Sequence, residues 1–209
     1  MTEQDKKCKI IVTGPIQVNT CLFEHDGFLF ITDPGGSAEK IAEAADAFPA
    51  GLERIILLTH AHVDHIAGLP ETVRLLGIRK IFLHPADIPL YESPGNAIEP
   101  YIPHPEGLPA TCWPPDFPGL EIRHTPGHTQ GGVIFFFPKE KTAFTGDTIF
   151  LESIGRTDLP GGNEKQLEDS IRREIYSLPE DTLLIPGHGP STSVGYEIRN
   201  NPYVRPETK

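Results

Sequence analysis

The chain has 209 residues, 38% of them hydrophobic and 22% charged, and its formal net charge at pH 7 is -11. This composition predicts a globular protein, and the length suits one domain with a full core, so we expect a single domain over residues 1–209. The acidic balance argues against nucleic acid as a main partner, because phosphate binding needs a basic surface.

The sequence shows no membrane or secretion signal. No apolar run approaches the roughly 20 residues that cross a bilayer, and the polar stretch Met1–Lys7 has no apolar core of a signal peptide. The three cysteines are an odd number without a Cys-x-x-Cys pair, which does not favour a disulfide framework. We therefore expect a cytoplasmic protein with no membrane partner.

Strand and helix signals alternate in the first half of the chain. Short runs rich in β-formers and separated by turn residues predict strands, and Ser37 is a suitable N-cap for an amphipathic helix. One apolar run predicts a strand buried on both faces, Arg54–Thr59. The other predicted strands are Cys8–Gly14, Val18–Glu24, Phe28–Asp33 and Lys80–Leu83, and the predicted helices are Ala38–Phe48 and Pro70–Gly77.

Residues 85–119 differ in composition from the rest of the chain, because they hold ten of the 22 prolines. We interpret this segment as a loop-rich wall of a binding cleft, since long ordered loops in compact domains are often functional. An irregular surface excursion is the alternative. Tyr91, Tyr101 and Trp113 could line the cleft or serve in packing. The segment is not interpreted as a domain linker, because polar motifs lie on both sides of it.

Regular structure resumes after residue 119. Asn163 is a plausible cap for a long helix. The predicted strands are Leu120–His124, Val133–Phe137, Thr142–Thr145 and Thr182–Ile185, and the predicted helices are Asn163–Leu178 and Val194–Asn200. Strands mixed with a few helices in this way predict a layered α/β protein.

The strongest chemical signal is the run from His60 to His65, which holds His60, His62, Asp64 and His65 directly after the buried strand. Imidazole nitrogen and carboxylate oxygen suit zinc, and also iron or manganese. In an extended or turning backbone His60 and His62 can point the same way, and Asp64 and His65 would follow on the turn into a helix. Four ligands so close in sequence suit two adjacent ions better than one.

Three more candidate ligands lie in or next to glycine-containing turns beside strands. They are His128 in Pro-Gly-His, Asp147 in Thr-Gly-Asp and His188 in Gly-His-Gly. Open α/β sheets bind ligands at the carboxyl ends of their strands, and glycine allows the backbone to approach closely. Clustered polar residues of this kind usually need a partner such as a metal. The other four histidines lack this context: His25, His84, His104 and His124.

The complete pattern, His60-x-His62-x-Asp64-His65 followed by His128, Asp147 and His188, resembles the ligand set of the metallo-β-lactamase-fold hydrolases. The resemblance implies a four-layer αββα sandwich, an α/β fold with two mixed sheets between helices. It also implies two divalent metal ions, with zinc favoured and iron or manganese as alternatives. The implied ligands are His60, His62 and His128 for one ion, Asp64, His65 and His188 for the other, and Asp147 bridging both.

Within that family the chain is similar to the short glyoxalase II-like proteins that lack a C-terminal helical domain. The runs that carry this likeness are Gly146–Phe150, Gly155–Gly162 and Ile185–Pro190. About twenty residues follow His188, so we expect the basic residues that grip glutathione in full-length hydroxyacylglutathione hydrolases to be absent. A β-lactamase of this fold commonly has Cys where this chain has Asp147, so the sequence does not favour antibiotic hydrolysis.

The resemblance implies hydrolysis of a thioester, with S-D-lactoylglutathione or a related hydroxyacyl thioester as the small-molecule substrate. A hydroxide shared by the two ions would attack the carbonyl, and Asp64 would orient it and take up its proton. Arg156 could bind a substrate carboxylate through a two-point contact, or could form a structural ion pair. Asp158 could fix Arg156 or a ligand histidine.

Other functions remain open on the same residues. A persulfide dioxygenase of this fold also has a Gly-Arg-Thr-Asp stretch, and would hold one iron through His60, His128 and Asp147. Lactonase or nuclease activity would fit the scaffold, although the acidic balance disfavours a nuclease. A non-enzymatic metal-binding or redox partner module is the remaining alternative. Metal identity, oxygen consumption and turnover of a generic thioester would separate these functions.

Overall fold

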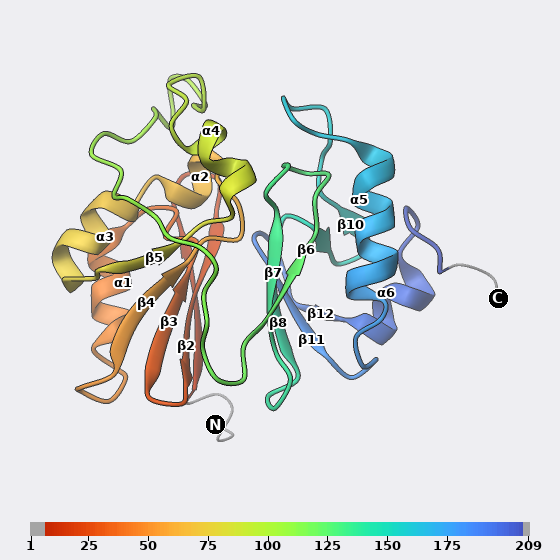
Figure 1. Cartoon of the computed structure of the whole chain (residues 1–209), viewed down its shortest axis with the longest axis horizontal. Helices are drawn as coiled ribbons and strands as arrows, with labels where there is room; N and C mark the ends of the chain where they lie inside the picture. Colours follow the sequence, from red (N-terminus) through yellow and green to blue (C-terminus); the bar gives the residue numbers. More distant parts are fainter. Residues whose placement is uncertain (1–6, 207–209) are drawn as a thin grey trace. The chain divides into compact units, whose positions relative to one another are not determined.

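The computed structural model describes residues 7–206 (Figure 1). The chain forms two compact units, the N-terminal unit Met1–Pro115 and the C-terminal unit Asp116–Lys209. Each unit contains one five-stranded sheet. Residues 1–6, which we expected to hold no signal peptide, lie outside the described range. The expectation of one domain over residues 1–209 stays a prediction.

The sheet of the N-terminal unit is mixed, with the strand order β1-β2-β3-β4-β5. The first three strands pair antiparallel, whereas β3, β4 and β5 pair parallel. Asp26 and Gly27 join β2 to β3 with φ angles of 46° and 86°, the positive values that a tight hairpin turn needs. The strands are β1 (Cys8–Thr13), β2 (Val18–His25), β3 (Phe28–Thr32), β4 (Glu53–Leu57) and β5 (Lys80–Phe82).

Two helices cover one face of this sheet, α1 (Ala38–Ala45) and α3 (Leu69–Leu76). Ile31 of β3 and Ile41 of α1 belong to one buried cluster, so the apolar stripe of the helix faces the sheet. Ser37 precedes α1 as expected, but its side chain makes no capping hydrogen bond and its φ is 51°. The helix also ends three residues before the predicted end at Phe48.

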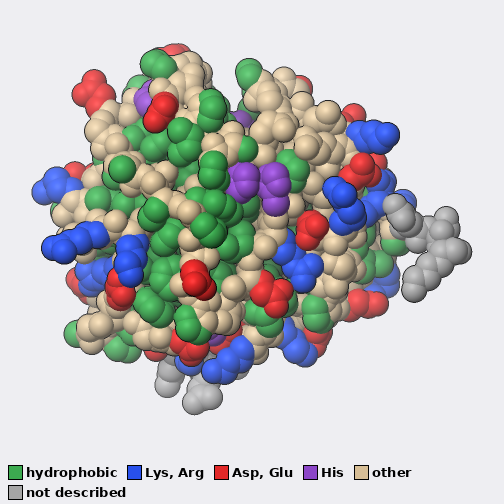
Figure 2. All heavy atoms as spheres, viewed as in Figure 1, with side chains coloured by type: hydrophobic (Ala, Val, Ile, Leu, Met, Phe, Trp, Pro, Cys, Tyr) green, Lys and Arg blue, Asp and Glu red, His purple; other side chains and the backbone are tan. Residues whose placement is uncertain are grey.

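Residues 85–119 contain two short helical turns, the 3-10 turn η1 (Pro85–Asp87) and α4 (Ile88–Tyr91). Their later part pairs with the sheet, because Phe82 and Cys112 form a parallel bridge. In Figure 2 apolar side chains gather on the face where this segment crosses the front of the first sheet. The segment therefore packs on the sheet through part of its length and is not a loose excursion.

The sheet of the C-terminal unit is also mixed, with the order β12-β11-β8-β7-β6. Only β11 and β8 pair parallel among its described neighbours. A separate two-stranded sheet follows β8 in sequence. The strands are β6 (Glu121–His124), β7 (Val133–Phe137), β8 (Thr142–Gly146), β9 (Ile149–Phe150), β10 (Ser153–Ile154), β11 (Leu183–Pro186) and β12 (Thr192–Ser193).

The helices of this unit are α5 (Glu164–Ser170), the π-helical turn η2 (Ile171–Ile175) and α6 (Val194–Asn200). Asn163 caps α5 as predicted, since its side chain accepts a hydrogen bond from the Gln166 amide. The predicted single helix to Leu178 instead becomes π-helical, because the Tyr176 amide donates to Ile171 O, five residues back. A hydrophobic pattern does not reveal such a change from the α-helical to the π-helical hydrogen-bond pattern.

The predicted fold class is confirmed, a mixed α/β protein with two mixed sheets flanked by helices. Most predicted strands and helices are present with ends shifted by a few residues. The elements that the sequence missed have five residues or fewer, which is too short for a periodic pattern: α2 (Val63–Ile66), η1, α4, β9, β10 and β12. Cys8, Cys21 and Cys112 are free thiols. Within residues 7–206, no helix has the length and apolar character of a membrane span.

Candidate metal centre

The N-terminal unit gathers its four candidate ligands in the metal loop, residues 59–65, which leads from β4 into α2. The rings of His60 and His62 meet edge to face with centroids 4.9 Å apart, and the rings of His60 and His65 lie 4.1 Å apart. The Asp64 carboxylate oxygen Oδ2 lies 3.4 Å from His65 Nε2. All four side chains are buried. The structure therefore brings these four predicted ligands together.

The turn into α2 produces this convergence. His62 precedes the helix with extended backbone, and the His65 amide donates to His62 O at 3.0 Å. Asp64 and His65 therefore lie on the first helical turn, as the sequence indicated. The tight turn brings the ring of His65 back to the ring of His60, 4.1 Å away between centroids.

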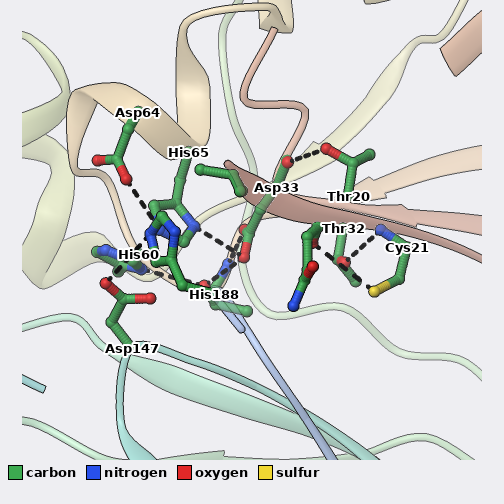
Figure 3. Close-up of polar contacts among 12 residues, drawn as sticks. Thr20, Cys21, Thr32, Asp33, His60, Asp64, His65, Asp147 and His188 are labelled. Carbon is green, nitrogen blue, oxygen red and sulfur yellow. Dashed lines mark hydrogen bonds and ion pairs between the residues drawn. The ribbon is translucent and has the colours of Figure 1, made fainter. Parts of the chain in front are cut away.

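Asp33, which the sequence did not identify as a site residue, also contacts this loop. Its Oδ2 lies 3.1 Å from His65 Nδ1, and its Oδ1 accepts a hydrogen bond from the Thr59 amide at 2.8 Å. Figure 3 shows Asp33 and Asp64 approaching different nitrogens of the His65 ring. Asp33 follows β3, the parallel neighbour of β4, so both strand ends lie at one edge of the sheet.

The hydrogen bonds around Thr59 assign the ring orientation of His60. The Thr59 hydroxyl donates to Asp33 Oδ2 at 2.6 Å, so its oxygen can accept from His60 Nδ1 at 3.1 Å. A proton on Nδ1 leaves the lone pair of His60 on Nε2. Asp33 thus orients His65 directly and His60 through Thr59.

The C-terminal unit gathers the other three candidates at the ends of its strands. Asp147 follows β8, and its Oδ2 lies 3.6 Å from His128 Nε2 and 3.7 Å from His188 Nε2. The Gly187 amide donates to Gly146 O at 2.8 Å, which holds the end of β11 against the end of β8. The sequence-distant His128, Asp147 and His188 are thereby brought together.

A backbone carbonyl orients His128. His128 Nδ1 lies 2.7 Å from Arg156 O, which can only accept, so this nitrogen carries the proton and Nε2 carries the lone pair. Gly155 allows this approach, because a Cβ at this position would lie 1.9 Å from Asp147 O and 3.2 Å from the ring of His128. The glycine of the Gly-Arg-Thr-Asp run is therefore required by close packing at the site.

The Arg156 side chain forms a two-point ion pair with Asp158. Nε and Nη2 each donate to one carboxylate oxygen at 2.8 Å, and both side chains are largely exposed. This hydrogen bonding lowers the pKa of Asp158 to about 2 and raises the pKa of Arg156. The sequence left open whether Asp158 fixes Arg156 or a ligand histidine, and the structure shows the former.

The donor chemistry of both units fits divalent metal ions. His60, His65 and His128 each use Nδ1 toward a protein hydroxyl, carboxylate or carbonyl. In His65 and His128 this leaves Nε2 beside a carboxylate, 3.4 Å from Asp64 Oδ2 and 3.6 Å from Asp147 Oδ2. Metal-binding histidines are held in this way, with the non-ligating nitrogen bonded to a second protein group. Among the other histidines, His84 accepts a hydrogen bond from the Ala86 amide. The Nε2 atoms of His104 and His124 lie 2.9 Å from Tyr91 O and Gln130 O.

Comparison with known proteins gives a family for this arrangement. Residues 13–188 match the metallo-beta-lactamase superfamily, a range that contains all seven candidate ligands. The hydroxyacylglutathione hydrolase GloC of Haemophilus influenzae is 34% identical over 204 residues, which cover 93% of this chain and 96% of that protein.

Two solved structures resemble the chain over 94% of its length. TTHA1623, crystallised in a di-iron-bound form, is 37% identical, with a TM-score of 0.83 and all of that chain covered. The BLEG-1 B3 metallo-beta-lactamase is 35% identical, with a TM-score of 0.81 and 99% of that chain covered. The chain therefore belongs to the metallo-β-lactamase superfamily.

Proposed function

We propose that this protein is a metal-dependent hydrolase that cleaves a thioester, most simply S-D-lactoylglutathione or a related hydroxyacyl thioester. The observation that carries metal dependence is the common orientation of three histidine rings, each held at Nδ1. The thioester class is supported by the likeness to GloC, a hydroxyacylglutathione hydrolase by name. In Figure 2 basic side chains lie beside acidic ones, which supports a small-molecule substrate over nucleic acid.

We assign the seven side chains to one centre of two divalent ions, supported by the family match that spans them. Zinc is the first candidate, and the di-iron form of TTHA1623 supports iron as the second. The proposed ligands are His60, His62 and His128 for one ion, Asp64, His65 and His188 for the other, and Asp147 for both.

The bound ions would supply Lewis acidity and lower the pKa of a coordinated water. The protein's own contribution is to hold the donors. The buried Asp64 carboxylate, fixed beside His65 Nε2, would orient the attacking water and accept its proton. A thiolate leaves readily from the substrate, so the reaction needs no strong general acid on its side.

Arg156 is proposed to bind a carboxylate of the substrate. Its guanidinium already makes a two-point contact with the Asp158 carboxylate. Because both side chains are exposed, a substrate carboxylate could replace Asp158 in the same geometry. This role would affect substrate affinity more than the chemical step.

The test combines metal analysis with turnover of S-lactoylglutathione. We expect close to two ions per chain and rapid thioester cleavage, lost by at least about 100-fold in Asp64→Ala because one residue serves both binding and proton transfer. Asp46→Ala is the matched control, since Asp46 is an exposed carboxylate in the same unit with helical backbone, and it should leave turnover unchanged.

Other outcomes of this assay would replace the proposal. A single iron per chain, no thioester cleavage and oxygen uptake with glutathione persulfide would establish a persulfide dioxygenase instead. Cleavage of a chromogenic cephalosporin without thioester cleavage would indicate a β-lactamase, the activity in the name of BLEG-1. Metal binding with no turnover of any of these substrates would indicate a metal-binding module.

A further inference from the structure

Two buried polar side chains outside the candidate ligand set contact the backbone of the metal loop. Asp87 Oδ2 accepts a hydrogen bond from the Ala61 amide at 3.0 Å. Asn96 contacts the loop twice, because its Nδ2 donates to Ala61 O at 2.7 Å and its Oδ1 accepts from the Val63 amide at 3.0 Å. Three backbone groups of the loop are therefore held by two side chains.

These hydrogen bonds go to the backbone of the residues that separate the ligands in sequence, and not to the ligand side chains. Ala61 separates His60 from His62, and Val63 separates His62 from Asp64. The Asn96 side-chain amide donates through Nδ2 and accepts through Oδ1 in one rigid plane. It therefore bridges the residues on either side of His62, as a neighbouring strand would. The backbone direction at this point decides whether successive side chains can reach the same ion.

Asp87 and Asn96 are themselves fixed. They lie 26 and 35 residues from Ala61, which both contact, and their exposed fractions are 1% and 7%. Asp87 ends η1, where its backbone amide donates to His84 O at 3.0 Å. The backbone amide of Asn96 donates to Ser93 O at 2.9 Å. Figure 1 shows α4, which separates them in sequence, beside α2. The contacts are therefore made by an ordered part of the N-terminal unit.

We propose that Asp87 and Asn96 are positioning residues that set the spacing of the metal ligands His60, His62 and Asp64. This inference rests on the proposed metal centre but not on the identity of its substrate. It also gives residues 85–119 a role, because Asp87 and Asn96, in the first half of this segment, hold the backbone of the metal loop. Removal of either side chain loosens the loop and lowers metal affinity, whereas the fold of the sheet is kept.

The experiment measures zinc affinity by competition with a chromophoric chelator, together with thermal unfolding of the metal-free protein. We expect Asn96→Ala and Asp87→Ala to lower zinc affinity by about 10- to 100-fold, the range found for groups that orient metal ligands. Asp87→Asn keeps an oxygen for the Ala61 amide and should restore most of the affinity. The absorption spectrum of the cobalt-substituted protein should change in the alanine variants, because it reports ligand geometry independently of turnover.

Tyr91→Phe is the matched control. Tyr91 lies between the two positioning residues in sequence and is buried, and its hydroxyl donates to Pro109 O at 2.8 Å, outside the metal loop. Phenylalanine keeps the ring and removes only this hydrogen bond. Its loss should lower stability but leave zinc affinity and the cobalt spectrum unchanged. If zinc affinity were equal in all variants, or if Tyr91→Phe lost as much zinc affinity as the alanine variants, this inference would be wrong and the proposed function would stand. A wild-type protein that binds no zinc, iron or manganese would overturn the proposed function first.

Discussion

The two units place their candidate ligands by different means. The N-terminal unit has four ligands in one short loop, and polar side chains from other parts of the unit hold that loop, namely Asp33, Asp87 and Asn96. The C-terminal unit has three ligands spread from residue 128 to residue 188, and backbone groups hold them. Ligand geometry should therefore depend on buried polar side chains in the first unit and on glycines in the second.

Among substitutions that test this difference between the units, Gly155→Ala should have the largest effect on stability and turnover. A methyl group there would lie 1.9 Å from Asp147 O, so Gly155→Ala must displace either Asp147 or the Arg156 carbonyl that orients His128. We expect a loss of about 2–4 kcal/mol of stability and at least about 100-fold lower turnover. Chemical denaturation and steady-state kinetics measure these two quantities.

Gly51→Ala is the control for glycine substitution as such. Gly51 has φ of 99° and no atom within 4 Å of its ideal Cβ, so alanine meets backbone strain but no clash. Its cost should stay near about 1 kcal/mol, with turnover unchanged. If Gly155→Ala behaved like Gly51→Ala, backbone packing would not control the ligands of the C-terminal unit.

The next effect tests the side-chain mechanism of the N-terminal unit. Asp33→Asn keeps a residue that tolerates the positive φ of 45°. An amide group then replaces one oxygen of the carboxylate that accepts from Thr59 and lies 3.1 Å from His65 Nδ1. We expect about 10- to 100-fold weaker metal binding with little change of fold. Titration calorimetry with zinc checks this. Unchanged zinc affinity would show that His65 needs no carboxylate at Nδ1 to bind metal.

The sequence predicted those parts of the site that follow simple spacing rules. The metal loop was recognisable because four candidate ligands lie within six residues after an apolar strand. Asp33 carried the same signal, a carboxylate at a strand end beside Pro-Gly-Gly, but it was predicted only as the last residue of the strand Phe28–Asp33. The structure adds its contacts to Thr59 and His65.

Asp87 and Asn96 could not have been found in this way. They lie in a proline-rich segment without periodicity, and their contacts depend on how that segment returns to the sheet. The expectation of a cleft wall in residues 85–119 stays a prediction. Of its aromatic residues, Tyr91 is buried and serves in packing, Trp113 packs on His84, and Tyr101 is exposed.

The smallest effect is expected at Arg156, where side-chain and backbone roles can be separated. Its carbonyl orients His128, whereas its guanidinium pairs with Asp158 at the surface. Arg156→Ala keeps the carbonyl, so metal affinity and kcat should be retained. If the guanidinium binds a substrate carboxylate, KM should rise by about 10-fold, since such contacts contribute mainly to binding.

The pH dependence separates this role from a stabilising one. Because the folded-state pKa of Asp158 is depressed to about 2, any stability from the pair is present above the ordinary carboxyl pKa and is lost only as pH falls toward 2. Between pH 5 and pH 8 the wild type and Arg156→Ala should therefore show parallel stability profiles, because an exposed ion pair contributes little to stability. An unchanged KM would show that Arg156 contributes only its backbone carbonyl, and that the C-terminal unit supplies no substrate-binding cation at this position.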